Sequence, residues 1–290
     1  MFIPRKILEG KLAEMLAEDV GQGDITTSLI VLGESTSEAQ VIAKETGVAA
    51  GIEEAKILLE SLGLKVEDLI EDGEEIKTKR TIMKISGDTR MILSVERTML
   101  NLLSRMSGIA TTTRQLTEKL QAIKLKTKIA ATRKTAPGLL YFDKKAVRIG
   151  GGDTHRLHLD DMILVKDNHI VVAGGVEKAV KQVKQEVSFS KKIEVEVTAG
   201  ADVLKAAEAG ADIIMLDNFS PEQIEDAITS LKKAGFFGRI LLEASGGITA
   251  ENLLDFASKV DIVSMGELTH SAKALDISLE ITKVHEKQKS

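Results

Sequence analysis

The chain has 290 residues, 43% of them hydrophobic and 29% charged, a composition that argues against disorder. Its net charge of −5 disfavours general nucleic-acid binding, so any anion must be held by a local basic cluster. The absence of cysteine excludes disulfides, thiolate metal sites and a cysteine nucleophile. The N-terminal pattern lacks the apolar core of a signal peptide, and no stretch approaches the ~18 apolar residues of a membrane span, so we expect a cytoplasmic protein without a membrane partner.

The chain up to about residue 110 is expected to form a small α+β unit. Its apolar spacing predicts helices over residues 6–18, 52–62 and 94–106, and strands over residues 38–44 and 80–86. The alternation of Ala39, Val41 and Ala43 fits a strand with one buried face. This part therefore resembles an α+β sandwich.

After residue 125, short apolar runs alternate with helix-period segments. The runs predict strands over residues 128–132, 162–165, 193–197, 212–216, 240–242 and 261–265. The segments between them predict helices over residues 176–187, 201–209, 221–234 and 250–258, the third beginning with Ser220 as N-cap and Pro221 as first residue. This alternation indicates a parallel α/β sheet, either an incomplete barrel or an open doubly wound sheet.

Ionisable residues occur at five of these strands, mostly where a strand ends. In α/β barrels, chemistry gathers at the C-terminal ends of the strands, so we expect an active site at that edge. The cations that we expect to converge there are Arg133, Lys134, His155, Arg156 and Lys166. They suit a substrate with two carboxylates, or with a carboxylate and a phosphate. Three further cations, Lys144, Lys145 and Arg148, lie in a helical stretch and are expected to be solvated surface charges.

Acids and glycines complete the expected site. Glu194 and Glu196 share one face of a strand, and carboxylates that face inward need a partner. One interpretation is a salt bridge to Lys166 or Arg133; the other is that Glu196 and Asp217 face Mg²⁺. A further glycine run, Gly150 to Gly152, precedes His155 and Arg156. The glycines of the loops after the last two strands favour a phosphate site of backbone amides.

Ten short motifs, in one order along almost the whole chain, resemble those of the quinolinate phosphoribosyltransferases. They are EDVGQGDIT (18–26), ERTMLN (96–101), SGIAT (107–111), TRKTAPG (132–138), GGG (150–152), HR (155–156), KDNH (166–169), MLDNF (215–219), EASGG (243–247) and GELTHS (266–271). The resemblance implies an N-terminal sandwich domain over residues 1–110, joined by about 270–290, and an incomplete α/β barrel over residues 111–269. It also implies a homodimer in which Arg97 reaches the partner's active site; without the resemblance, Arg97 would be interpreted as a helix-surface charge.

The resemblance further implies an activity: quinolinate and phosphoribosyl pyrophosphate give nicotinate mononucleotide, pyrophosphate and CO₂ in de novo NAD biosynthesis. It gives Lys134, Lys166, Glu196 and Asp217 catalytic roles, with Mg²⁺ at Glu196 and Asp217 offsetting charge on the departing pyrophosphate. Quinolinate would contact Arg97, Arg133, Lys134, His155, Arg156 and Lys166. The ribose 5-phosphate would contact Ser245, Gly246, Gly266 and His270. The chain departs from the family pattern at Ala136 and at Asp153-Thr154, neither of which removes a charged group from the expected site.

Three alternatives stay open at this point. One is a related phosphoribosyltransferase-like protein with another substrate, such as the relative associated with molybdenum transport. Another is a Schiff-base aldolase that uses Lys166, which ends a predicted strand. The third is a barrel that binds phosphorylated metabolites without catalysis, although the pair Glu196 and Asp217 favours an enzyme.

Overall fold

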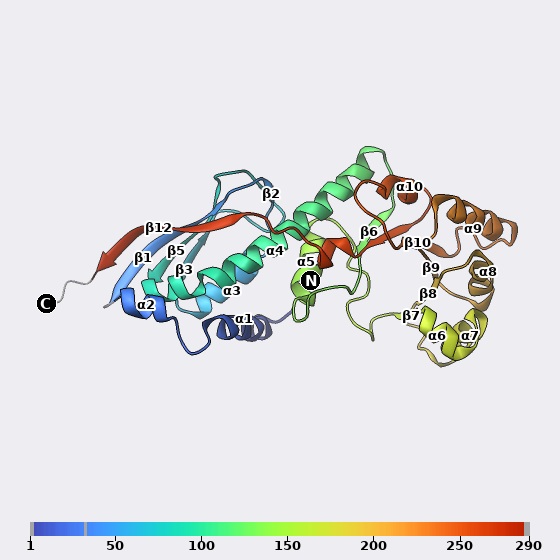
Figure 1. Cartoon of the computed structure of the whole chain (residues 1–290), viewed down its shortest axis with the longest axis horizontal. Helices are drawn as coiled ribbons and strands as arrows, with labels where there is room; N and C mark the ends of the chain where they lie inside the picture. The colour runs from blue at the N-terminus through green and yellow to red at the C-terminus, as the bar shows by residue number, and fades with distance from the viewer. Residues whose placement is uncertain (1–2, 32–33, 287–290) are drawn as a thin grey trace. The chain divides into compact units, whose positions relative to one another are not determined.

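The computed structural model describes residues 3–31 and 34–286, and the chain forms two compact units (Figure 1). The first unit comprises Met1–Arg114, Tyr141–Gly150 and Ala272–Ser290, and the second comprises Gln115–Leu140 and Gly151–Ser271. The domain division expected from the sequence stays a prediction; the compact units differ from it in grouping Tyr141–Gly150 with the first unit.

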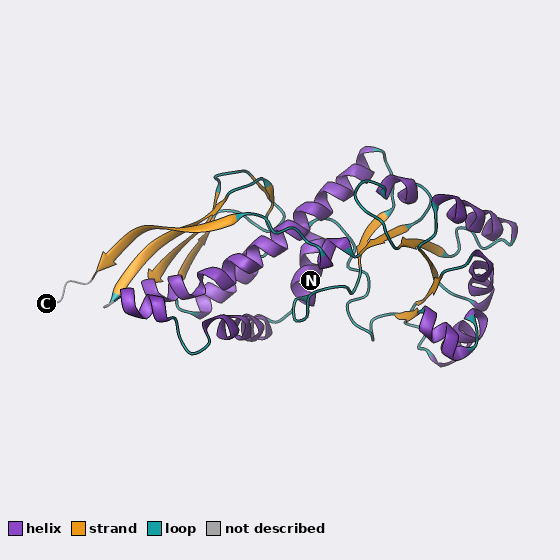
Figure 2. Cartoon of the chain, in the orientation of Figure 1, coloured by secondary structure: helices purple, strands orange, loops and turns teal. Residues whose placement is uncertain are grey.

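The first unit is built on an antiparallel sheet of order β12-β1-β5-β3. Its strands are β1 (Ser35–Ala43), β3 (Lys65–Asp68), β5 (Thr81–Asp88) and β12 (Ile277–Glu286). In β1 every second residue from Ser37 to Ala43 is buried, which confirms the expected half-buried strand. Figure 2 shows the helices of this unit along one side of the sheet. They include α1 (Arg5–Val20), α2 (Ile25–Ile30) and α3 (Ile52–Ser61), and a two-stranded ladder pairs β2 (Gly47–Val48) with β4 (Glu75–Ile76).

Helix α4 (Thr89–Ala122) has 34 residues and extends well beyond the predicted 94–106. The Ser, Gly and Thr residues of its middle turns are weak helix formers, which explains the short prediction. The hydroxyls of Thr111 and Thr113 instead donate to the helix carbonyls of Ser107 and Ile109. An added Cβ at Gly108 would collide with the Lys273 carbonyl, so close packing against the C-terminal segment overrides the weak propensity.

Helix α5 (Leu140–Ile149) corrects one expectation from the sequence. Arg148 is exposed as expected, but Lys144 and Lys145 are buried and not solvated. Lys145 Nζ lies 2.5 Å from Glu53, 2.7 Å from Glu54 and 3.4 Å from Asp72. The helical period alone did not show that this face of α5 packs against acids of the first unit.

The second unit is an incomplete barrel of six parallel strands in the order β6-β11-β10-β9-β8-β7. The strands are β6 (Lys128–Ala131), β7 (Ile163–Val165), β8 (Ile193–Val197), β9 (Ile213–Asp217), β10 (Leu241–Ser245) and β11 (Ile262–Met265). Since β6 and β7 form the two edges and do not pair, the sheet stays open between them, which confirms the expected incomplete barrel.

Helices connect the strands of this sheet. They are α6 (Asp167–Ala173), α7 (Val176–Glu186), α8 (Gly200–Ala209), α9 (Pro221–Lys233), α10 (Leu253–Ala257) and α11 (Glu267–His270). Figure 1 shows α7, α8 and α9 on the outer side of the sheet. The predicted start of α9 is confirmed: Ser220 Oγ accepts from the backbone N–H of Gln223, whose side chain accepts from Ser220 N–H. Within residues 3–31 and 34–286, no helix has the length and apolar character to cross a membrane.

Candidate active site

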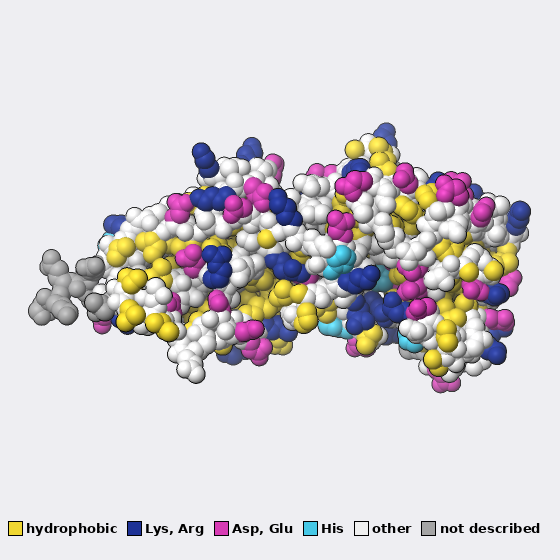
Figure 3. Space-filling model, viewed as in Figure 1, with side chains coloured by type: hydrophobic (Ala, Val, Ile, Leu, Met, Phe, Trp, Pro, Cys, Tyr) yellow, Lys and Arg dark blue, Asp and Glu magenta, His cyan; other side chains and the backbone are white. Residues whose placement is uncertain are grey.

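A cavity of about 510 Å³ lies at the C-terminal ends of the barrel strands. It brings together most of the residues expected from the sequence: Arg133, Lys134, His155, Arg156, Lys166, Glu196, Asp217, Ser245 and Gly246. Figure 3 shows Lys and Arg side chains gathered beside His side chains over the barrel part of the chain. Cations and acids from different strand ends therefore face one space, as parallel strands in one sheet require.

Lys166 and Glu196 form an ion pair within this cavity. Lys166 follows β7 directly, and its Nζ lies 3.0 Å from Oε2 of Glu196 on the neighbouring strand β8. The Lys166 N–H donates to His169 Nδ1, which fixes the first turn of α6. The salt bridge that the sequence offered as one interpretation of Glu196 is thus present, and it leaves Glu196 13% exposed at the cavity.

The loops after β9 and β10 are locked together. Asn218 adopts a left-handed conformation (φ 57°), donates its backbone N–H to the Ser245 carbonyl and donates from Nδ2 to Asp217. Gly246 also has positive φ (89°), and an added Cβ there would overlap Asn218 Oδ1. Only glycine combines this backbone conformation with this contact, so Gly246 keeps bare backbone at the cavity.

The loops after β6 and β11 are joined in a similar way. The Thr269 hydroxyl donates to the Lys134 carbonyl at 2.9 Å. A Cβ added to Gly266 would lie 2.9 Å from His270 Cδ2 and 3.2 Å from Lys134 Cδ. Gly266 and His270 are therefore neighbours of Lys134, although they do not line the cavity itself.

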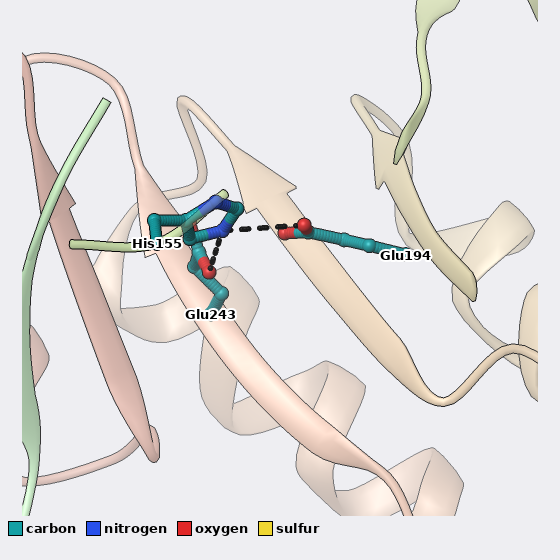
Figure 4. Close-up of side chains that lie close together, drawn as sticks. All are labelled: His155, Glu194 and Glu243. Atoms are coloured by element: carbon teal, nitrogen blue, oxygen red, sulfur yellow. Dashed lines mark hydrogen bonds and ion pairs between the residues drawn. The ribbon is translucent and has the colours of Figure 1, made fainter. Parts of the chain in front are cut away.

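His155 lies between two buried carboxylates (Figure 4). Its Nε2 is 3.1 Å from Glu243 Oε2 and 3.2 Å from Glu194 Oε2, and both glutamates are fully buried. Burial opposes the charged ring, but the hydrogen bond to Glu243 and the negative charges of both glutamates outweigh it and raise the pKa of His155 to about 10. Burial also raises the pKa of the Glu194 carboxyl.

Glu243 was not among the expected site residues. Its signal in the sequence was a carboxylate inside the otherwise apolar run Leu241–Ala244, and such a residue is rarely buried without a partner. The partner, His155, lies 88 residues earlier in the chain, so no local pattern could connect the two.

Arg156 extends the cation group next to His155. It is 8% exposed, and burial lowers its pKa, an effect that nearby Arg133 increases and Glu194 opposes. Two arginines thus face the same cavity with a buried acid behind them. Such an arrangement suits an anion with more than one carboxylate.

Arg97 is the one expected site residue that belongs to the first unit. It lies on α4 and is exposed. Within residues 3–31 and 34–286 the Arg97 side chain makes no ion pair and no side-chain hydrogen bond, so its guanidinium is available to a ligand or to another chain.

Two clusters within the described ranges have the ligand types of a metal site: His155, Glu194 and Glu243, and Glu53, Glu54 and Asp72. The second already surrounds the Lys145 ammonium, whose charge satisfies it. Glu196 and Asp217 belong to neither cluster. Their oxygens nevertheless face the cavity from adjacent strands and are of the hard kind that Mg²⁺ prefers.

The fold and the cavity define an α/β-barrel enzyme whose site gathers cations and acids at the C-terminal ends of the strands. The chain belongs to the quinolinate phosphoribosyltransferase family: residues 24–107 match the model of its N-terminal domain and residues 109–280 that of its C-terminal domain. The chain is thus an enzyme of the phosphoribosyltransferase class. The family, the fold class and the enzyme class expected from the sequence are confirmed.

Individual relatives agree along nearly their full lengths. A probable nicotinate-nucleotide pyrophosphorylase (carboxylating) of Methanothermobacter thermautotrophicus is 46% identical over 271 residues, which cover 93% of this chain and 97% of the relative. The human nicotinate-nucleotide pyrophosphorylase (carboxylating) is 36% identical, with 97% and 94% covered. The crystal structure of NadC from Streptococcus pyogenes superposes with a TM-score of 0.88 at 38% identity and covers 98% of this chain and 99% of that one.

Proposed function

We propose that the chain transfers the phosphoribosyl group of phosphoribosyl pyrophosphate to quinolinate in de novo NAD biosynthesis. The quinolinate nitrogen bonds to C1 of the ribose, and pyrophosphate leaves with the electrons of the broken C–O bond. The 2-carboxylate then departs as CO₂, and a proton takes its place on the ring, which gives nicotinate mononucleotide. The observation that carries this proposal is the single cavity in which Arg133, Arg156 and Lys166 face Glu196 and Asp217.

The cations of the cavity wall would hold the two carboxylates of quinolinate. Arginine binds carboxylates through two parallel hydrogen bonds, and lysine adds a point charge. Arg133 and Arg156 would form the forks, with Lys134, His155 and Lys166 beside them. Fixing the pyridine ring against the ribose supplies much of the rate acceleration through orientation.

The inward acids would act on the phosphoribosyl donor. Glu196 and Asp217 would hold Mg²⁺, which offsets charge on pyrophosphate when it is bound. The same carboxylates would stabilise positive charge that develops at ribose C1 as the C–O bond breaks. Lys134 and Lys166 would neutralise the anionic groups on the other side of the cavity.

The glycine loops would hold the 5-phosphate of the ribose. Ser245 and Gly246 line the cavity directly, and Gly266 and His270 adjoin Lys134. Backbone amides of such loops form anion sites, and a histidine side chain adds a donor. The locked conformation of Asn218 and Gly246 keeps this loop in place before the donor binds.

The working unit that we propose is a cytoplasmic homodimer, in which Arg97 of one subunit completes the quinolinate site of its partner. Support comes from the exposed position of Arg97 on α4 and from its guanidinium, which makes no ion pair with the part of the chain that the structure describes. We propose no nucleic-acid partner, in keeping with the net charge of −5.

One assay tests the proposed function. The purified protein is incubated with phosphoribosyl pyrophosphate and Mg²⁺, with either quinolinate or nicotinate, and pyrophosphate and CO₂ are measured. We expect equal amounts of both products with quinolinate and none with nicotinate. Conversion of nicotinate alone would overturn the assignment of quinolinate as substrate. Binding of both ligands without pyrophosphate release would indicate a sensor, and a borohydride-trapped adduct at Lys166 would indicate an aldolase.

A further inference from the structure

Two carboxylates occupy the barrel interior where a packed core is expected. Glu194 on β8 and Glu243 on β10 are both fully buried. Inward positions of barrel strands are mostly filled by Val, Ile and Leu, and a buried carboxylate is costly unless it is paired. The barrel therefore keeps these two charges in spite of their cost, which indicates that both carboxylates have a partner that requires them.

They hold a residue that does not come from a barrel strand. His155 follows the glycine run after α5, in a segment that joins the open edge of the barrel through a bridge between Asp153 and Ala130. From there its ring points inward and meets both glutamates, as Figure 4 shows. The side chain thus enters the barrel from the side where β6 and β7 do not pair.

The backbone of His155 is strained. Its φ of 50° lies in the left-handed region, which a non-glycine residue adopts only when its surroundings hold it there. Asp153 Oδ1 accepts a hydrogen bond from the His155 backbone N–H at 2.8 Å, and Glu194 and Glu243 hold Nε2 of the ring. If the glutamates were neutral, the main attraction that keeps the ring inside the barrel would be lost.

The next residue is Arg156, so the conformation of His155 decides where this guanidinium lies. Arg156 and Arg133 face the same cavity and repel one another. Glu194 attracts Arg156 from behind the wall without lining the cavity. The buried acids therefore offset the charges of a cation group that must be assembled before any anion arrives.

We propose that Glu194 and Glu243 are positioning residues, which hold His155 in its left-handed conformation and thereby place Arg156 in the cavity wall, ready for an acidic substrate. The inference rests on the proposed function in that the substrate is taken to be a dicarboxylate such as quinolinate. The two acids act through His155 and Arg156, so their loss should weaken binding of the dicarboxylate and spare the phosphoribosyl donor.

The test uses the full-length variants Glu194→Gln and Glu243→Gln, which keep shape and remove charge. We expect the quinolinate Kd from calorimetry and the quinolinate KM to rise roughly ten-fold or more, with the KM for phosphoribosyl pyrophosphate changed less than about two-fold. The matched control is Glu54→Gln, an equally buried carboxylate in the first unit that is paired with Lys145. It should lower stability and leave both KM values unchanged.

Two outcomes would overturn the inference. Either both variants keep the quinolinate affinity of the wild type, or the KM for quinolinate and the KM for phosphoribosyl pyrophosphate rise by the same factor. If the Gln variants do not fold, Glu194→Asp and Glu243→Asp keep the charge but withdraw it by one methylene, and the same selective loss is expected of them. A crystal structure of the Glu243 variant gives a readout that needs no turnover. In this variant the backbone of His155 should leave the left-handed region. If His155 instead keeps its left-handed conformation and Arg156 still lines the cavity, the inference is contradicted, whichever substrate the wild type uses.

Discussion

Lys166 Nζ lies 3.0 Å from Glu196 Oε2, so a cation expected to bind substrate and an acid expected to bind Mg²⁺ neutralise one another across β7 and β8. A divalent ion at Glu196 must therefore compete with Lys166. The variant Lys166→Met should bind Mg²⁺ more tightly in calorimetry, because its competitor is gone. Its kcat/KM for quinolinate should nevertheless fall roughly 10²- to 10³-fold, because a preorganised charge is lost. Unchanged Mg²⁺ affinity would show that Glu196 does not bind the ion.

Arg97 gives a test of the proposed dimer. Arg97→Ala should fold and dimerise, since the side chain is exposed, and should lose quinolinate affinity. Mixing it with Lys134→Ala, which is inactive for a different reason, should restore part of the activity, because hybrid dimers contain one site with neither substitution. Pyrophosphate release after subunit exchange is the measurement. Exchange without recovery would place Arg97 in its own subunit's site, or outside any site.

Gly246 is expected to tolerate no side chain. Gly246→Ala places a Cβ against Asn218 at a positive φ, and should lower the free energy of unfolding by about 1–3 kcal/mol and raise the KM for phosphoribosyl pyrophosphate. Gly238→Ala is the control, because Gly238 has a similar φ of 79° but nothing within 4 Å of the added carbon. Urea unfolding and kinetics of both variants separate backbone strain from the contact. Equal effects would mean that the contact with Asn218 is unimportant.

Lys145 is expected to stabilise the first unit strongly. Lys145→Met leaves Glu54 buried without its cation and should lower the free energy of unfolding by about 3–5 kcal/mol. Lys181→Met removes an exposed ion pair with Glu177 and should change stability little. The comparison is made by urea unfolding at neutral pH. A loss as small as that of the Lys181 variant would show that Glu54 takes up a proton at little cost.

The raised pKa of His155 predicts that the free energy of unfolding depends on pH. Its pKa is raised to about 10 in the folded chain, against about 6.5 when unfolded, so between these values the folded state binds more protons. The contribution of His155 is therefore complete below about pH 6.5 and is lost as the pH rises through about 10. Urea unfolding at several pH values should show a steeper alkaline loss for the wild type than for His155→Asn. Parallel curves would mean that the ring is neutral between the glutamates.

Much of the barrel could be predicted because each of its strands is a short apolar run followed by a helix. The same rule places Arg133, Lys166 and Asp217 at one edge, and the structure brings them into one cavity. What local patterns could not give were pairs distant in sequence. The link from His155 to Glu243 spans 88 residues, and the burial of Lys145 depends on Glu53 and Glu54, which lie 92 and 91 residues away.

The sheet of the first unit shows the same limit. β3 is short and mostly polar, and the pairing of β12 depends on a strand at the other end of the chain. The length of α4 was underestimated because its Gly and Thr residues are weak helix formers in isolation. In each case a tertiary contact decides the local structure.

The pairing of β1 with β12 also governs the order in which the protein can be completed during synthesis. Ser35 lies opposite Glu286, so one edge of β1 has to wait for almost the whole remaining chain to leave the ribosome. Contacts between residues this far apart close large loops and form slowly. The growing chain therefore carries an open strand edge for most of its translation, a condition that favours aggregation. A nascent chain stopped before residue 277 should accordingly depend on chaperones, whereas the released protein should not.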